Sequence, residues 1–416
     1  MREKTNYRTS LILFLVSFLF CLPGLRAEGN SLAKIYRQGK IVLKPEMIID
    51  SSSLPPGVLF VGVASISFDS LGNLYFLDFK DNNIKKFDSA GKFLKIIGQK
   101  GQGPGDFSSP VSFDVAKDRI FVWDMGNRRI CALTLEGEAA TSRNISGLSG
   151  RPRKLRALPG GDLVVETEKI HFDDPKKPQD VFLELLSPDL QLKGTIYSQS
   201  VWREKYIRTE QFGLINIPQP FSPDILWDIS PDGRIIIGFA ANYEFGIYNS
   251  QGNLFLSVKH PFKPVKIKDK DKKNHFEAIT FFDGKSIRRD RPDFIVKNTE
   301  FPEYKPAYSS LMVDGEGNIL VHPFSEEEAK EDFIFDAFSP EGKFISRVEI
   351  IEPEINLFDR ETKWQGNHVW IRKIEPDGTT KFTRYRIEPY VQRKNSTAAR
   401  RNLHNSFFGC HYPALP

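Results

Sequence analysis

Two stretches in the first third of this 416-residue chain repeat each other at an offset of 46 residues. Residues 66–78 (ISFDSLGNLYFLD) match residues 111–124 (VSFDVAKDRIFVWD), and residues 78–84 (DFKDNNI) match residues 124–130 (DMGNRRI). A period of this length indicates that one supersecondary unit recurs along the chain. Such a unit cannot bury its apolar faces alone, so neighbouring units must stack on one another.

Each unit contains two hairpin signals, in which turns rich in Gly, Asp and Asn separate short runs of aromatic and branched residues. Turns of the first kind recur at 159–162, 231–234 and 315–318, and turns of the second kind at 187–190, 250–253 and 339–342. The runs 73–77, 235–239 and 333–338 have the length and composition of strands. Glycine takes a positive φ without penalty, which suits it to these turns. We therefore expect four antiparallel strands in each unit.

The number of units predicts the architecture. Five complete units begin near Ala64, Val111, Lys154, Leu226 and Tyr308. A sixth, from Lys363 to Pro389, lacks a fourth strand, and a spare strand-like run lies at Lys40–Asp50. A period of 40 to 50 residues with four strands is typical of a propeller blade. We predict an all-β fold, a six-bladed β-propeller of four-stranded antiparallel blades that an N-terminal strand closes into a ring without free edges.

The first two units also resemble a known family. Residues 124–130, preceded by residues 98–110 (GQKGQGPGDFSSP), resemble the repeat of NHL-type six-bladed β-propellers. The chain as a whole resembles the exported bacterial "6-bladed β-propeller" proteins. The strong match covers residues 60–152, and the later blades follow the hairpin pattern alone. The resemblance implies a propeller fold and an exported protein.

The N-terminal segment has the pattern of a secretory signal. Residues 1–10 are polar and basic, residues 11–22 are mostly apolar, and Ala27 follows the Pro23-Gly24 break. The apolar run is shorter than a membrane span requires, although an uncleaved anchor stays open as an alternative. Phe20 before Cys21 does not suit lipoprotein processing. We expect a signal peptide over residues 1–27, a propeller over 28–390, and a periplasmic or secreted protein.

The C-terminal tail, residues 391–416, is basic and has no hydrophobic periodicity, so we expect it to be disordered. The whole chain has 58 basic and 53 acidic residues, but the body from 28 to 390 has 50 and 52. This balance excludes a general nucleic-acid-binding surface. After removal of the signal, no run approaches membrane-spanning length, and a monomer is expected.

The long insertions point to a binding face. In a propeller, the turns between strands 1 and 2 and strands 3 and 4 lie on one face, and the 2–3 turns and 4–1 linkers lie on the other. All the clear 1–2 and 3–4 turns are short. The long insertions all fall in 2–3 turns or 4–1 linkers, and they are residues 168–180, 198–224, 260–307, 322–332 and 352–362. Functional loops concentrate on one side of a rigid scaffold, although shielding of the channel mouth would give the same pattern.

These insertions carry opposite charges. Residues 259–273 hold seven lysines against two aspartates, and residues 326–332 form an acidic run. A solvated loop would have the same composition. If this face binds a partner, its candidate contact residues are the lysines and nearby aromatic residues of one insertion, namely Lys266, Lys268, Lys270, Lys272, Lys273, Phe276, Phe281 and Phe282.

Motifs for catalysis and for cofactors are weak. The histidines have no zinc-ligand spacing, no nucleophile elbow is present, and the glycines at 98–105 suit an interblade linker better than a phosphate loop. Asp78 and Asp124 occupy equal repeat positions, where they could hold calcium or, as we favour, accept hydrogen bonds from backbone N–H groups. We expect the tryptophans and Cys131 to be buried core residues.

Two classes of function remain. One is a non-catalytic exported propeller, without a cofactor, that binds a protein, peptide or glycan through its insertion-rich face. The other is a lactonase-like hydrolase or lyase that uses a divalent metal, calcium for example, in the axial channel.

Overall fold

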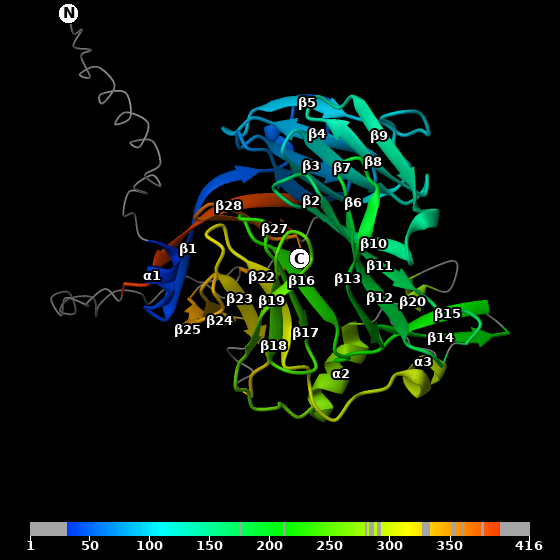
Figure 1. The fold of residues 1–416 in the computed structure, drawn as a ribbon, viewed down its shortest axis with the longest axis vertical. Coiled ribbons are helices and arrows are strands. Elements are labelled where there is room, and N and C mark those ends of the chain that lie inside the picture. The colour runs from blue at the N-terminus through cyan, green and yellow to red at the C-terminus, as the bar shows by residue number, and fades with distance from the viewer. Residues whose placement is uncertain are drawn as a thin grey trace, which may run out of the picture.

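The computed structural model describes residues 31–174, 176–210, 213–278, 281–282, 287–288, 293–326, 333–351, 355–359, 361–375 and 378–391. Four four-stranded sheets and one eight-stranded sheet, which joins two blades, form a six-bladed β-propeller (Figure 1). The fold predicted from the repeats is confirmed. The predicted signal peptide and nearly all of the predicted C-terminal tail lie outside the described residues.

The first three blades follow one another without interruption in the chain. Blade 1 contains β2 (Val63–Phe68), β3 (Leu74–Asp78), β4 (Asn83–Phe87) and β5 (Phe93–Ile97). Blade 2 contains β6 (Pro110–Ala116), β7 (Arg119–Asp124), β8 (Arg129–Thr134) and β9 (Ala139–Asn144). Blade 3 contains β10 (Arg151–Ala157), β11 (Leu163–Lys169), β12 (Gln179–Leu186) and β13 (Leu192–Val201).

The last three blades are separated by the longer insertions. Blade 4 contains β16 (Ile225–Ile229), β17 (Ile235–Phe239), β18 (Glu244–Tyr248) and β19 (Leu254–Lys259). Blade 5 contains β22 (Tyr308–Val313), β23 (Ile319–Pro323), β24 (Ile334–Phe338) and β25 (Phe344–Ile350). Blade 6 contains β26 (Lys363–Gln365), β27 (His368–Ile374), β28 (Thr380–Pro389) and β1 (Lys40–Ile49).

Strand β1 closes the ring at the predicted place. It pairs antiparallel with β28 from Ile41↔Pro389 to Ile49↔Phe382, as the fourth strand of blade 6. It also makes a short parallel pairing with β25 of blade 5 at Lys40↔Glu349. In Figure 1 the blue β1 runs beside the red-orange β28. Because the last blade takes its outer strand from the start of the chain, both ends of the domain are held by one sheet.

The remaining elements lie outside the blades. A short helix, α1 (Leu32–Tyr36), precedes β1, and two 3₁₀ turns, η1 (Ser51–Ser53) and η2 (Ile145–Gly147), lie in linkers. The insertions contain the hairpin β14 (Glu204–Thr209) and β15 (Gly213–Pro218), helices α2 (Asp269–Ala278) and α3 (Asp293–Asn298), and the two-residue strands β20 (Phe281–Phe282) and β21 (Ile287–Arg288). These helices lack a sequence pattern that would have predicted them. None of the described helices is long and apolar enough to cross a membrane.

The core lies between adjacent blades. One cluster joins Tyr75 and Ile84 of blade 1 to Val122 and Leu133 of blade 2, all fully buried, and five similar clusters follow around the ring. Three of the tryptophans, Trp123, Trp227 and Trp370, belong to this core. Cys131 is also buried, which raises the pKa of its thiol to about 11. These residues therefore stabilise blade packing, as expected. The expectation is wrong for Trp202, which is 38% exposed.

Candidate functional site

The first strands of all six blades meet at the propeller axis through one polar network. Asp114 of β6 accepts hydrogen bonds from Ser67 of β2 at 2.7 Å and from Arg156 of β10 at 3.1 Å, and it pairs with Lys363 of β26 at 3.2 Å. Arg156 reaches Asp228 of β16 at 2.9 Å, and Asp228 accepts the backbone N–H of Val313 in β22 at 2.9 Å. The network therefore joins every blade across the axis.

Ion pairing dominates the electrostatics of this axial network. Burial alone would raise the pKa of Asp114, but Lys363 and Arg156 outweigh it and lower the pKa to about 2. Burial and the charge of Arg156 lower the pKa of the Lys363 amine to about 8, against the opposing effect of Asp114 and Asp228. Asp114 is thus ionised at neutral pH, and the cations Lys363 and Arg156 compensate its charge.

This donor set does not fit a divalent metal. Calcium takes six to eight oxygen ligands, and a zinc site needs clustered nitrogen, sulfur or oxygen donors. Here the carboxylates of Asp114 and Asp228 already hold Arg156 and Lys363. Within the part of the chain that the structure describes, no group of three or more His, Cys, Asp or Glu side chains could hold a metal ion. The sequence alternative of an axial metal centre therefore gains no support from the axis residues.

Asp78 and Asp124 have the structural role that we favoured. Asp78 accepts the backbone N–H groups of Val61 at 2.8 Å and Gly62 at 2.9 Å, and it pairs with buried Lys85. Asp124 accepts the N–H of Ser108 at 2.8 Å. Both carboxylates thereby hold the linker that leads into the first strand of their own blade.

The glycine-rich linker over residues 98–110 is an interblade connection. Phe107 is fully buried within it, and the side chains of Asn127 and Arg129 donate to the carbonyls of Gly101 and Gly103, both at 2.9 Å. The linker carbonyls are therefore bound by the 2–3 turn of blade 2, and no phosphate cradle is formed.

The five long insertions contact one another in ring order. Phe172 and Tyr206 join the first two insertions through an edge-to-face contact at 5.5 Å. Lys205 and Glu300 join the second and third through an ion pair at 2.6 Å. The third and fourth meet at Lys263–Glu326, 2.8 Å apart, and the fourth and fifth meet where His322 stacks on Phe358 at 4.6 Å. The described parts of the five predicted insertions are thus connected to one another. We call them the insertion layer, which comprises the described residues within 168–180, 198–224, 260–307, 322–332 and 352–362, except residues 198–201, which belong to β13.

Lys305 and two phenylalanines form the centre of this layer. Phe221 of the second insertion lies 6.0 Å from Phe324 of the fourth, and the Lys305 amine lies 5.5 Å and 5.1 Å from the two rings. Lys305 also pairs with Asp271 of α2 at 3.1 Å. Since Lys305 is only 8% exposed, this cation fixes the helical insertion against its neighbours.

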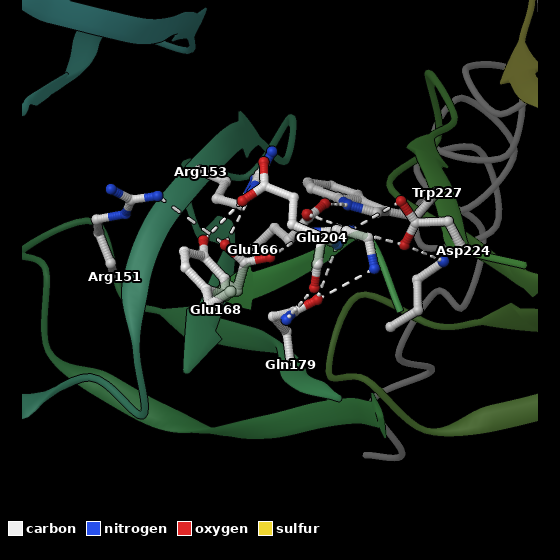
Figure 2. A network of polar contacts seen from close by, with 11 residues as sticks. Arg151, Arg153, Glu166, Glu168, Gln179, Glu204, Asp224 and Trp227 are labelled. Carbon is white, nitrogen blue, oxygen red and sulfur yellow. Dashed lines mark hydrogen bonds and ion pairs between the residues drawn. The ribbon is translucent and has the colours of Figure 1, made fainter. Parts of the chain in front are cut away.

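Arg203 anchors the insertion layer to blade 3. Figure 2 labels its three carboxylate partners, Glu166, Glu168 and Asp224. Its guanidinium lies 2.9 Å from Glu166 and 2.8 Å from Asp224, and 3.5 Å from Glu168. Glu166 in turn accepts the indole N–H of Trp227 at 2.7 Å. The anchor therefore continues from the second insertion to the first strand of blade 4, next to the axis.

The outer end of this network is accessible. Glu168 pairs with Arg153 at 2.8 Å and more distantly with Arg151 at 3.9 Å, and these two arginine side chains are 36% and 54% exposed. Phe172 of the first insertion is 56% exposed, and Trp202 of the second insertion is 38% exposed. Arginine and aromatic side chains are the residues that most often dominate binding energy at protein interfaces.

The structure places the predicted lysines in and before α2. Lys266 pairs with Glu303 at 3.5 Å, Lys272 with Asp269 at 3.3 Å, and Lys273 with Glu277 at 3.8 Å. Lys268 lies just before the helix and Lys270 within it. The lysines are thus brought together on one exposed segment, where nearby acids offset part of their charge.

The predicted aromatic residues divide into two groups. Phe276 packs inward against Phe301, with ring centroids 5.6 Å apart, so it stabilises the insertion. Phe281 and Phe282 form β20, which pairs with Ile287 and Arg288 of β21. Arg203, Arg153 and Phe172 were not predicted, because isolated charged and aromatic residues in loops carry no sequence motif.

The fold and its axial network define a six-bladed β-propeller protein. Residues 57–148 match a family model described as "6-bladed beta-propeller", which corresponds to blades 1 and 2 and the linker before them. Among curated proteins, none matches this sequence.

Several solved structures resemble this chain at low sequence identity. A member of the DUF4221 family from Bacteroides vulgatus is 13% identical with a TM-score of 0.51, over 85% of this chain and 100% of that chain. A streptogramin B lyase structure is 13% identical with a TM-score of 0.42, over 81% of this chain and 86% of that one. Regucalcin, a calcium-binding protein from Agrobacterium tumefaciens, is 10% identical with a TM-score of 0.40, over 84% of this chain and 97% of that chain. At 13% identity, the likeness to the DUF4221 protein concerns the fold alone.

Proposed function

We propose that this protein is an exported, non-catalytic β-propeller that binds a protein, peptide or glycan through its insertion layer. The observation that carries the proposal is the unbroken series of contacts that links all five long insertions, from Phe172–Tyr206 to His322–Phe358. Loops held in this way form a pre-organised surface, which reduces the entropy that binding must offset. The signal-like pattern of residues 1–27 supports export.

Side chains on the insertion layer and on the adjacent strand β10 support recognition of a partner at two areas. Arg151, Arg153 and Phe172 offer hydrogen-bond donors and an aromatic surface beside the Arg203 anchor. Lys266 and the lysines of α2 add a cationic area on the third insertion. The charges of these lysines would mainly steer association, whereas aromatic and arginine contacts hold a complex together.

The proposal is tested by hydrogen-exchange footprinting of the full chain with a partner that co-purifies from the exported fraction. Protection should map to the insertion layer. Replacing Lys266, Lys268, Lys270, Lys272 and Lys273 by Ser should slow association and flatten its salt dependence, and Phe281→Ala with Phe282→Ala should speed dissociation. Arg153→Ala should also weaken the complex. Protection confined to the short turns around Gly91, Gly137, Gly252 and Gly342 would show that the opposite face is the binding face.

A further inference from the structure

A pocket of about 240 Å³ lies at the side of the propeller, between β13 of blade 3 and strands β17 to β19 of blade 4. We call it the interblade pocket, and its lining includes Tyr197, Phe239, Asn242, Glu244, Gly246 and Tyr248. It is built from blade strands and the 2–3 turn of blade 4, so it is separate from the anchor around Arg203. Its size suits one small ligand or one unit of a polymer.

The pocket exists because blade 4 has a glycine where blades 1, 2, 3 and 5 have a buried side chain. Gly246 of β18 is paired with Ile237 of β17. The residues at the same register position are Lys85, Cys131, Glu184 and Asp336, in blades 1, 2, 3 and 5 respectively. All four are buried, with exposures of 0 to 5%.

Gly246 also controls the shape of the pocket. A Cβ atom at Gly246 would lie 2.7 Å from the Tyr248 ring and 2.8 Å from a Leu254 methyl group. Any side chain here would therefore displace the Tyr248 ring. Glycine inside a strand packs poorly, and it often marks a place where a ligand or another backbone approaches closely.

The lining offers hydrogen-bonding groups that the described part of the chain leaves unused. The hydroxyl groups of Tyr197 and Tyr248 and the side-chain amide of Asn242 have no partner among the described residues, whereas the other tyrosine nearby, Tyr308, donates to the Glu244 carbonyl at 2.9 Å. Burial raises the pKa of both Tyr197 and Tyr248, so their hydroxyls remain donors at neutral pH. Two donors and an amide therefore accompany the aromatic rings of Tyr197, Phe239 and Tyr248.

The charge of the pocket favours a neutral ligand. Glu244 is its only ionisable acid, and the Lys259 amine pairs with that carboxylate at 3.2 Å. An anion would meet the carboxylate, and an organic cation would have to compete with Lys259 for it. A neutral polyhydroxyl ligand avoids both costs, because its hydroxyl groups donate to and accept from the same lining groups. Its C–H faces can also pack on the aromatic rings.

We propose that the interblade pocket binds a single neutral sugar unit, with its ring packed on Tyr197, Phe239 and Tyr248 and its hydroxyl groups bound by Asn242, Glu244 and the two phenols. The sugar is either free or the terminal unit of a glycan. The site does not depend on the proposed binding role of the insertion layer.

Saturation-transfer NMR on the full chain tests this site, with D-glucose, D-galactose, D-mannose and N-acetyl-D-glucosamine as separate probes. At least one sugar should bind saturably with a Kd on the order of 1 mM. The double variant Tyr197→Phe/Tyr248→Phe should bind that sugar about 10-fold more weakly, since each lost hydrogen bond contributes modestly. Gly246→Val should abolish binding by filling the pocket.

Tyr390→Phe, a change of the same kind on a 38% exposed tyrosine away from the pocket, serves as the matched control and should bind like wild type. Thermal melts establish whether each variant is folded. If Gly246→Val does not fold, the Tyr197→Phe/Tyr248→Phe variant alone tests the site. Absence of binding for all four sugars would overturn the proposal. Equal affinity in the double variant, or binding of choline in place of the sugars, would also overturn it.

Discussion

The guanidinium of Arg203 lies 2.9 Å from the carboxylate of Glu166, and this pair joins the insertion after blade 3 to the second strand of that blade. The same arginine also binds Glu168 and Asp224, and its side chain is only 12% exposed. One residue of a loop thus compensates three carboxylates, two of which belong to the blade. The insertion layer is therefore attached to the propeller by buried charge as well as by packing.

Removal of Arg203 should be strongly destabilising. Arg203→Ala leaves Glu166 and Glu168 without their shared cation, and loss of one partner of a buried ion pair typically costs about 3–5 kcal/mol. Arg151→Ala removes the exposed, 3.9 Å contact to Glu168 and should change the free energy of unfolding by less than about 0.5 kcal/mol. Urea unfolding of both variants measures the difference, and equal effects would contradict the anchoring role.

Closure of the ring by β1 makes a prediction about the N-terminal segment. A protein that lacks residues 28–50 should expose the edge of β28 in blade 6 and aggregate or melt at a much lower temperature. Thermal unfolding with light scattering measures this. Unchanged melting behaviour would mean that β1 contributes little to closure.

Two substitutions within β1 provide a matched comparison. Leu43 is 3% exposed and Ile48 is 54% exposed on the same strand. Leu43→Ala should cost about 2–5 kcal/mol through the lost burial and the cavity that remains. Ile48→Ala should cost less than about 1 kcal/mol, since an exposed residue loses little burial. Similar costs at the two positions would indicate that β1 does not pack against the core as described.

Asp314 predicts an unusual dependence of stability on pH. Burial raises its pKa to about 6, even though Asn318, Glu316 and Tyr36 all donate hydrogen bonds to its carboxylate. The folded protein therefore holds a proton between about pH 4 and pH 6 that the unfolded chain has released, so this residue lowers the free energy of unfolding as pH rises through that window.

Asp314→Asn removes this titration. From about pH 4 to pH 7, the free energy of unfolding of the variant should rise relative to wild type by about 3 kcal/mol. Chemical denaturation across this range measures the difference. Asp88→Asn, in a surface turn where the carboxylate also accepts backbone N–H groups, is the control. A pH-independent difference for Asp314→Asn would refute the expectation.

The axial network predicts that stability does not depend on a divalent metal. Because Arg156 and Lys363 occupy the carboxylates of Asp114 and Asp228, neither millimolar calcium nor EDTA should move Tm by more than about 1 °C. Elemental analysis of the purified protein should find no stoichiometric calcium or zinc. A calcium-dependent rise in Tm that disappears in Asp114→Asn would establish the alternative, an axial metal centre.

Much of the architecture could be predicted from the sequence because its signals are local. Turn glycines and short apolar runs identified the blades. The first strand of each blade begins within three residues of its predicted start: β2 begins at Val63 where Ala64 was predicted, and β6 at Pro110 where Val111 was predicted. The spare run at Lys40–Asp50 predicted closure, because a sheet edge without a partner is costly. The insertions were assigned to one face by strand counting alone.

Only the tertiary structure decided the chemistry of the sites. Asp114, Arg156, Asp228 and Lys363 come from four blades, and no sequence pattern shows that their side chains meet at the axis. Gly246 is an ordinary strand residue until the strand register aligns it with buried Glu184 and Asp336. Backbone conformation follows from nearby residues, whereas these contacts depend on how six sheets pack around an axis, so the sequence by itself determined the propeller and its elaborated face but not the axial ion pairs or the interblade pocket.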